Sequence, residues 1–397
     1  MPSLKLQELL RAARVRAAFA REAKGGSARL TGLTPAAKAF WIAGAASDDP
    51  RNEFVLAVVP TDRDVEQVTS DVRFFLGGLE GLSADELESA VLPFPSQEVD
   101  PYRGLAPHLR IASARARALH AMASGQARVV VASAAALAPR VCPPDALLAL
   151  ALDLKPGDEI DTRRLAATLV DAGFTHQDPV DDHGEFCIRG GVIDIFPAGD
   201  DLPARIELVG DTIEAMRRYA PDTQRSVATI ERLKVVPLRE IVGGVFETRS
   251  TSDLQPPDAG SEAGPPESGQ LVPFFDYLGI ARRAVVVASE PDEIRERIEK
   301  QLAQISESYE QASAAEGSRR GAGAPKPFDE PPMAKAARPA PAELLIGWPD
   351  IERQFATASV LEELGLDDVG GTAEQLDNPP STELAPSAKP LAPAPSP

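Results

Sequence analysis

Hydrophobic residues in the first 150 positions fall into short apolar runs separated by longer amphipathic stretches. The run EFVLAVVP (53–60) is rich in β-branched residues and ends at a proline, and ARVVVAS (127–133) is a second run of the same kind. The stretch between them has helical spacing after Thr61, a candidate N-cap, and again at 109–124. Strands that alternate with helices predict a parallel sheet covered on both faces. We therefore expect residues 1–150 to form an α/β domain.

The pattern changes to alternation between residues 151 and 237. A turn and a short helix capped by Asp161 come first, in LKPGDEIDTRRLAATLVDAGF. The segments EFCIR-GG-VIDIF and ARIELV-GD-TIEAMRR then each place two alternating runs around a glycine turn, which predicts two β-hairpins. This region is expected to be a small α+β domain built on an antiparallel meander.

The remaining chain divides into a globular part and a tail. Residues 238–312 contain a further β-branched run and a long acidic helix, with a loop at 248–268 that is expected to be mobile because it is rich in Pro, Ser and acidic residues. Residues 321–397 contain 14 prolines. Such a composition cannot bury enough apolar area to offset chain entropy. We predict a mostly disordered, Pro/Ala-rich tail at 313–397 with one short element at 342–348.

Composition excludes several classes of function. No apolar run approaches the roughly 18–20 residues that a bilayer requires, so we expect a cytoplasmic protein without membrane contact. The formal net charge of -19 opposes binding to phosphates, so direct DNA binding is not expected. The stretch 101–144, with six arginines and no acidic residue, is a local exception that a solvated helix face explains. The two cysteines and four histidines lack ligand spacing, so no disulfide or metal site is predicted.

One stretch, GLTPAAKA, can be compared with the phosphate-binding pattern G-x-x-x-x-G-K-[ST]. Gly32 and Lys38 fit, but Ala37 replaces the second glycine and Ala39 replaces the hydroxyl that would ligate Mg²⁺. Pro35 removes a backbone N–H that would face phosphate. No nucleophile motif is present either. We predict a degenerate P-loop, no catalytic residues, no cofactor and hence no enzymatic activity.

Three blocks carry a resemblance to a known family: PFPSQEVDPYRGLAPH, HGEFCIRGGVIDIFP and YAPDTQRS. They resemble the UvrB-like N-terminal module of bacterial transcription-repair coupling factors, and the similarity runs from about residue 25 to 305. The resemblance implies that residues 1–150 and 238–312 are parts of one RecA-like domain, interrupted at 151–237 by a domain that binds UvrA. UvrB itself has an intact P-loop and an aromatic-rich hairpin after its FPS block, whereas this chain has only Tyr102 there.

The resemblance also implies where UvrA would bind. It places the contact on two arginines and an aromatic residue, at the positions of Arg189, Arg205 and Val209. Alternation puts Arg205 and Val209 on the same, polar face of their strand. Because residue 209 is Val rather than Phe, binding is expected to be weaker by roughly 5- to 30-fold.

Other interpretations of these residues stay open. Arg189 could instead pair with Glu185 or Asp194, and Arg205 could make a cross-strand ion pair. A full coupling factor also carries an RNA-polymerase-binding domain and a translocase motor, and we expect neither in this sequence. The predicted function is a non-catalytic module of transcription-coupled nucleotide-excision repair that recruits UvrA. The alternatives are a UvrB-like, damaged-DNA-binding ATPase and an inert fragment of a split coupling-factor gene.

Overall fold

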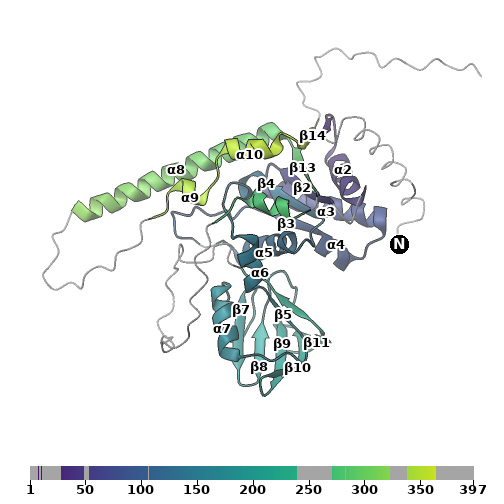
Figure 1. Cartoon of the computed structure of the whole chain (residues 1–397), viewed down its shortest axis with the longest axis vertical. Coiled ribbons are helices and arrows are strands. Elements are labelled where there is room, and N and C mark those ends of the chain that lie inside the picture. Colours follow the sequence, from purple (N-terminus) through teal and green to yellow (C-terminus); the bar gives the residue numbers. More distant parts are fainter. Residues whose placement is uncertain are drawn as a thin grey trace, which may run out of the picture. The chain divides into compact units, whose positions relative to one another are not determined.

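The computed structural model describes two six-stranded sheets of different kinds, a two-stranded sheet and the helices packed on them (Figure 1). The described residues are 8, 10, 28–48, 53–105, 107–238, 271–281, 283–321 and 338–363. The loop predicted at 248–268 lies outside these residues, as does the end of the predicted tail, 364–397. No helix in the described ranges combines the length and apolar character needed to cross a membrane.

The first sheet has six strands in the order β1-β14-β13-β2-β4-β3, and every neighbouring pair is parallel. Its strands are β1 (Arg29–Leu30), β2 (Glu53–Val59), β3 (Val91–Phe94), β4 (Val129–Ser133), β13 (Arg283–Ser289) and β14 (Ser359–Leu361). The central strand β2 is buried on both faces, as its unbroken apolar run predicts. The parallel α/β class predicted from the sequence is confirmed.

Helices cover both faces of this sheet. They are α2 (Pro35–Asp48), α3 (Asp62–Glu80), α4 (Ala84–Ala90), α5 (Leu109–Ala123), α6 (Pro144–Leu150), α8 (Pro291–Gly321), α9 (Pro341–Leu344), α10 (Trp348–Phe355) and the 3-10 turns η1 (Ala134–Ala136) and η2 (Phe274–Ile280). Helices α2 and α3 pack with Val55 and Ala57 of β2, whereas α5 and α8 pack on the opposite face with Leu56 and Val58. The predicted N-cap Thr61 is confirmed as part of a capping box at the start of α3.

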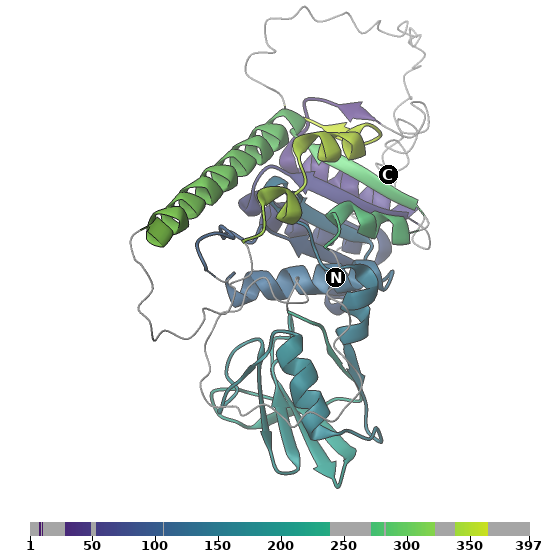
Figure 2. The same ribbon diagram turned by 60° about the vertical axis from the view of Figure 1, so that its left-hand side comes forward.

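The short element expected at 342–348 is present, but the ordered part of the predicted tail is longer than expected and spans residues 338–363. Helix α8 continues to Gly321, and the segment 338–363 forms α9, α10 and β14. Strand β14 inserts between β1 and β13 of the parallel sheet, and Figure 2 shows this yellow segment beside the green β13. The composition of the tail did not indicate the full extent of this segment, because only a few side chains, including Leu344 and Ile351, supply its core contacts.

The second sheet has the order β11-β10-β9-β8-β7-β6 and is antiparallel except for the β6/β7 pair. Its strands are β6 (Thr175–His176), β7 (Glu185–Arg189), β8 (Val192–Ile195), β9 (Ala204–Val209), β10 (Thr212–Tyr219) and β11 (Ser226–Thr229). Both predicted hairpins, β7/β8 and β9/β10, are confirmed. A two-stranded sheet of β5 (Leu152–Leu154) and β12 (Leu233–Val235) and the helix α7 (Thr162–Asp171), capped by Asp161, complete this region.

Helix α5 joins the two regions. Its Ala116 belongs to the same core as Ile195 and Ile206 of the antiparallel sheet. Gly199 has φ +74°, and a Cβ built there would lie 1.7 Å from Cδ of Arg117 on α5. The glycine is therefore required both by its backbone conformation and by the close approach of α5.

Candidate functional site

Lys38, the lysine of the degenerate P-loop, is buried among groups of its own chain. It lies in the first turn of α2, and its side chain is only 6% exposed. Its Nζ donates to Oγ of Ser289 at 3.1 Å, contacts Oε1 of Glu363 at 3.3 Å and forms an ion pair with Glu290. Ser289 ends β13, and Glu363 follows β14. Two carboxylates therefore surround the ammonium group that would face a phosphate in an intact P-loop.

The other residues of the loop keep the turn of a P-loop but lack its metal-binding hydroxyl. Gly32 has a positive φ of 75°, so the turn into α2 is preserved. The amide of Ala37 donates to Oγ1 of Thr34 at 3.3 Å, and Ala39 is completely buried in the core. Neither alanine offers a hydroxyl or a carboxylate to a metal ion. The described residues contain no cluster of His, Cys, Asp or Glu that could hold a metal.

Arg205 is held on the outer face of the antiparallel sheet by a buried carboxylate. On β8, Asp194 stands directly opposite Arg205 of β9 and is 2% exposed. Arg205 binds it through two hydrogen bonds, Nε to Oδ1 at 2.7 Å and Nη2 to Oδ2 at 3.0 Å. The guanidinium also donates to Gln224 and lies over the ring of Tyr219 at 4.5 Å. The cross-strand ion pair considered for Arg205 is therefore confirmed.

Arg189, at the end of β7, converges on the same carboxylate. Its Nη2 donates to Oδ2 of Asp194 and its Nη1 to Oδ1 of Asp178, both at 3.0 Å. Of the two partners considered for Arg189, Asp194 is confirmed, whereas Glu185 instead accepts from backbone amides at 181 and 182. The sheet thus brings both candidate arginines to one anion.

These contacts leave part of each guanidinium available. Arginine carries five N–H donors in a rigid fork. In the described ranges, Nη1 of Arg205 and Nε of Arg189 have no hydrogen-bond partner, and the two side chains are 23% and 48% exposed. Hydrogen bonding to Asp194 raises the pKa of Arg205, and burial raises the pKa of Tyr219. The hydrogen bonds to Asp194 thereby hold both guanidinium groups in place, yet each keeps donors for a second acceptor.

Val209, the third predicted contact, ends β9 and is 63% exposed. Sequence reasoning missed Arg217, which stands directly opposite Arg205 on β10 and donates to Oε1 of Glu207 at 2.8 Å. The alternation of residues in TIEAMRRY could have placed Arg217 on the polar face, but a register shift between Ile213 and Ala215 displaces that pattern by one residue.

Comparison with known proteins identifies the region that carries this face. The family model for the UvrB interaction domain matches residues 152–240. Residues 152–240 are thus similar to this domain, and we use its name for them below. The chain is also similar to transcription-repair-coupling factors, and the resemblance inferred from the sequence is confirmed.

Three of these relatives illustrate the extent of the similarity. The protein of Myxococcus xanthus is 33% identical over 189 residues, which is 47% of this chain and 15% of the relative. That of Escherichia coli is 33% identical over 153 residues, 38% and 13% of the two chains, and that of Bacillus subtilis is 27% identical over 218 residues, 54% and 17%. The chain thus matches less than a fifth of the length of each of these relatives.

Two of the six arginines of the stretch 101–144 make contacts within the fold instead of lying on a solvated helix face. Arg115 is completely buried, with its guanidinium 4.0 Å from the ring of Phe94. Arg128 binds the carboxylate of Glu80 through two hydrogen bonds. The expectation of a solvated helix face is therefore wrong for these two residues, because each is held inside the fold by an aromatic ring or an acid.

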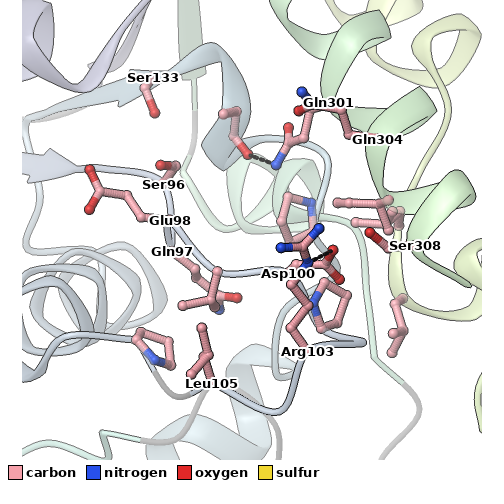
Figure 3. Close-up of a pocket in the computed structure, with 18 of the residues that line it drawn as sticks. Ser96, Gln97, Glu98, Asp100, Arg103, Leu105, Ser133, Gln301, Gln304 and Ser308 are labelled. Atoms are coloured by element: carbon pink, nitrogen blue, oxygen red, sulfur yellow. Dashed lines mark hydrogen bonds and ion pairs between the residues drawn. The ribbon is translucent and has the colours of Figure 1, made fainter. Parts of the chain in front are cut away.

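A pocket of about 1340 Å³ lies at the carboxyl ends of β2, β3 and β4 (Figure 3). Asp62 at the start of α3, Ser96 after β3 and Ser133 at the end of β4 line one side of it. Gln301 and Gln304 project from α8 on the other side. Asp62 accepts from the amide and hydroxyl of Ser96. Acidic and basic side chains line the pocket in equal numbers: Asp62, Glu98, Asp100 and Glu307 with Arg103, Arg140, Arg297 and Lys300. This balance does not favour a polyanion, and the pocket indicates no particular ligand.

Proposed function

We propose that this chain recruits UvrA in transcription-coupled nucleotide-excision repair, and that it does so without catalysis. The observation that carries the proposal is the convergence of Arg189 and Arg205 on Asp194, with Val209 exposed on the same strand as Arg205. This arrangement lies within the UvrB interaction domain, and the relatives are named for coupling transcription to repair.

The chemistry of the face suits a protein partner. Guanidinium groups that are fixed by an internal carboxylate lose little further conformational entropy when they bind a second one. The exposed Val209 adds an apolar contact beside them, and interfaces combine such a centre with charged neighbours. We infer that the two arginines pair with acceptors on UvrA and that Val209 packs against its surface.

The contacts of Lys38 support the absence of catalysis. Its ammonium group is enclosed by Glu290 and Glu363, so a nucleotide phosphate would have to displace two carboxylates from a buried cation. The alternative, a UvrB-like ATPase that binds damaged DNA, requires that site. Measurable ATP turnover by the purified chain that disappears in Lys38→Ala would favour the alternative over our proposal.

Titration of purified UvrA into the purified chain tests the recruitment directly. We expect the double variant Arg189→Ala, Arg205→Ala to lose about 2 kcal/mol or more of binding free energy, roughly 30-fold in affinity. Arg163→Ala, on α7, serves as a control because it removes one exposed positive charge elsewhere in the same domain. Equal affinities of the wild type and the double variant would remove the proposed site.

A further inference from the structure

The outer face of the UvrB interaction domain contains a third arginine, Arg217, beside Arg189 and Arg205. Arg217 of β10 and Arg205 of β9 are directly opposed, so two like charges stand side by side. Such a pair opposes sheet formation unless acidic neighbours compensate it. Here Asp194 compensates Arg205 and Glu207 compensates Arg217.

The three acids of this face differ sharply in burial. Asp194 is 2% exposed and is shared by two arginines. Glu207 is 33% exposed and binds only Arg217, whereas Asp178 is 48% exposed and binds only Arg189, among the described residues. Solvent-exposed ion pairs are weak and exchange partners readily, whereas a buried and multiply bonded carboxylate does not. The face therefore has one fixed anion flanked by two exchangeable ones.

We propose that Glu207 and Asp178 are placeholders for carboxylates of the partner, and that Arg217 is a third contact residue beside Arg189 and Arg205. This inference rests on the proposed function and assigns an acidic contact surface to the partner. On binding, carboxylates of the partner replace Glu207 at Arg217 and Asp178 at Arg189, while Asp194 stays bound to Arg205. The contact then extends across β7, β9 and β10.

The proposal makes an unusual prediction, because removing acids from the chain's own face strengthens binding. In the free protein Glu207 and Asp178 compete for the guanidinium groups, and in the complex they repel the carboxylates that have replaced them. Neutralising Glu207 or Asp178 removes that residue's competition in the free protein and its repulsion of the partner's carboxylates in the complex. The ion pairs of the face join Arg189, Arg205 and Arg217 to Asp178, Asp194 and Glu207, so neutralising one of these acids raises the net charge of the face by one.

The experiment titrates UvrA into the wild type, Glu207→Gln, Asp178→Asn, their double variant and Arg217→Ala. We expect each neutralised acid to tighten binding about two- to fivefold at low salt, and Arg217→Ala to weaken it to a similar or greater extent. The gains should shrink as salt is raised. Asp171→Asn, an exposed acid at the end of α7, removes the same charge away from the face and should leave the affinity unchanged. Melting temperatures verify that each variant is folded.

The outcomes separate this inference from the proposed function. If the Arg189→Ala, Arg205→Ala variant loses binding but Arg217→Ala does not, the partner does not reach β10 and the inference fails while recruitment stands. Weaker binding by Glu207→Gln, or equal tightening by Asp171→Asn, also overturns it, because the acid would then act as a contact or only through net charge. Failure of the wild type to bind UvrA overturns both.

Discussion

The degenerate P-loop and the interaction face use the same kind of ion pair with opposite burial. Around Lys38 the cation is buried, at 6% exposed, and the carboxylates of Glu290 and Glu363 lie nearer to solvent. Around Asp194 the anion is buried, at 2%, and the guanidinium groups of Arg189 and Arg205 lie outside it. A partner molecule cannot reach the buried member of an ion pair, whereas it can still bind the member that lies nearer to solvent. We therefore propose that the site around Lys38 is structural, whereas the face around Asp194 can bind a partner.

The largest expected effect comes from removing the buried anion. Asp194→Ala should destabilise the domain by about 3 kcal/mol, because both arginines lose their common partner. It should also weaken UvrA binding, since the guanidinium groups are no longer held in place. Urea unfolding and titration measure the two effects. Asp178→Ala, at the exposed pair with Arg189, is the control and should cost about 1 kcal/mol or less. Equal losses in the two variants would contradict the distinction between buried and exposed anions.

Removing the buried cation is expected to have the next largest effect. Lys38→Met should lower the free energy of unfolding by about 2 kcal/mol, since Glu290 and Glu363 would face each other without a cation. Arg29→Met, which breaks the exposed pair with Glu362, should leave stability close to that of the wild type. Chemical denaturation compares the two variants. A stable Lys38→Met protein would mean that the pair around Lys38 does not support the fold.

A smaller effect is expected at the apolar end of the interaction face. Val209→Phe restores a ring at the exposed end of β9 and should tighten UvrA binding by about 1–2 kcal/mol, or roughly 5- to 30-fold. Val227→Phe, on the edge strand β11 and 60% exposed, adds the same ring outside the row of arginines. Titration of UvrA into both variants distinguishes a local contact from a general gain in hydrophobicity, which would tighten both equally.

The smallest effect concerns the junction between the two regions. Burial, with a lesser contribution from Lys234, lowers the pKa of His120 on α5. The unfolded chain therefore binds a proton more readily than the folded one, so this residue's contribution is present above about pH 6.5 and is lost as pH falls below that value. His120→Gln should flatten the fall in unfolding free energy between pH 7 and pH 5. An unchanged slope would show that other groups dominate it.

The positions of the candidate residues could be predicted from the sequence to different degrees. Alternation was sufficient to place Arg205 on the polar face of its strand, because a strand with one buried face admits only one register. It could not reveal that Arg205 and Arg189 share Asp194, since that depends on the pairing of β8 with β9 and β7. Arg217 escaped notice because the irregularity in β10 breaks the period on which the prediction relied.

The sequence by itself determined the class of each region: apolar runs between helices specified the parallel sheet, and glycine turns between alternating segments specified the antiparallel one. The sequence also showed directly that Ala37 and Ala39 replace the second glycine and the hydroxyl residue of the P-loop pattern. Only the tertiary structure decided that Lys38 is surrounded by Glu290 and Glu363, and that the segment 338–363 belongs to the sheet. The physical reason is distance along the chain, because local patterns report what neighbouring residues favour, whereas the contacts of Lys38 join positions more than 250 residues apart.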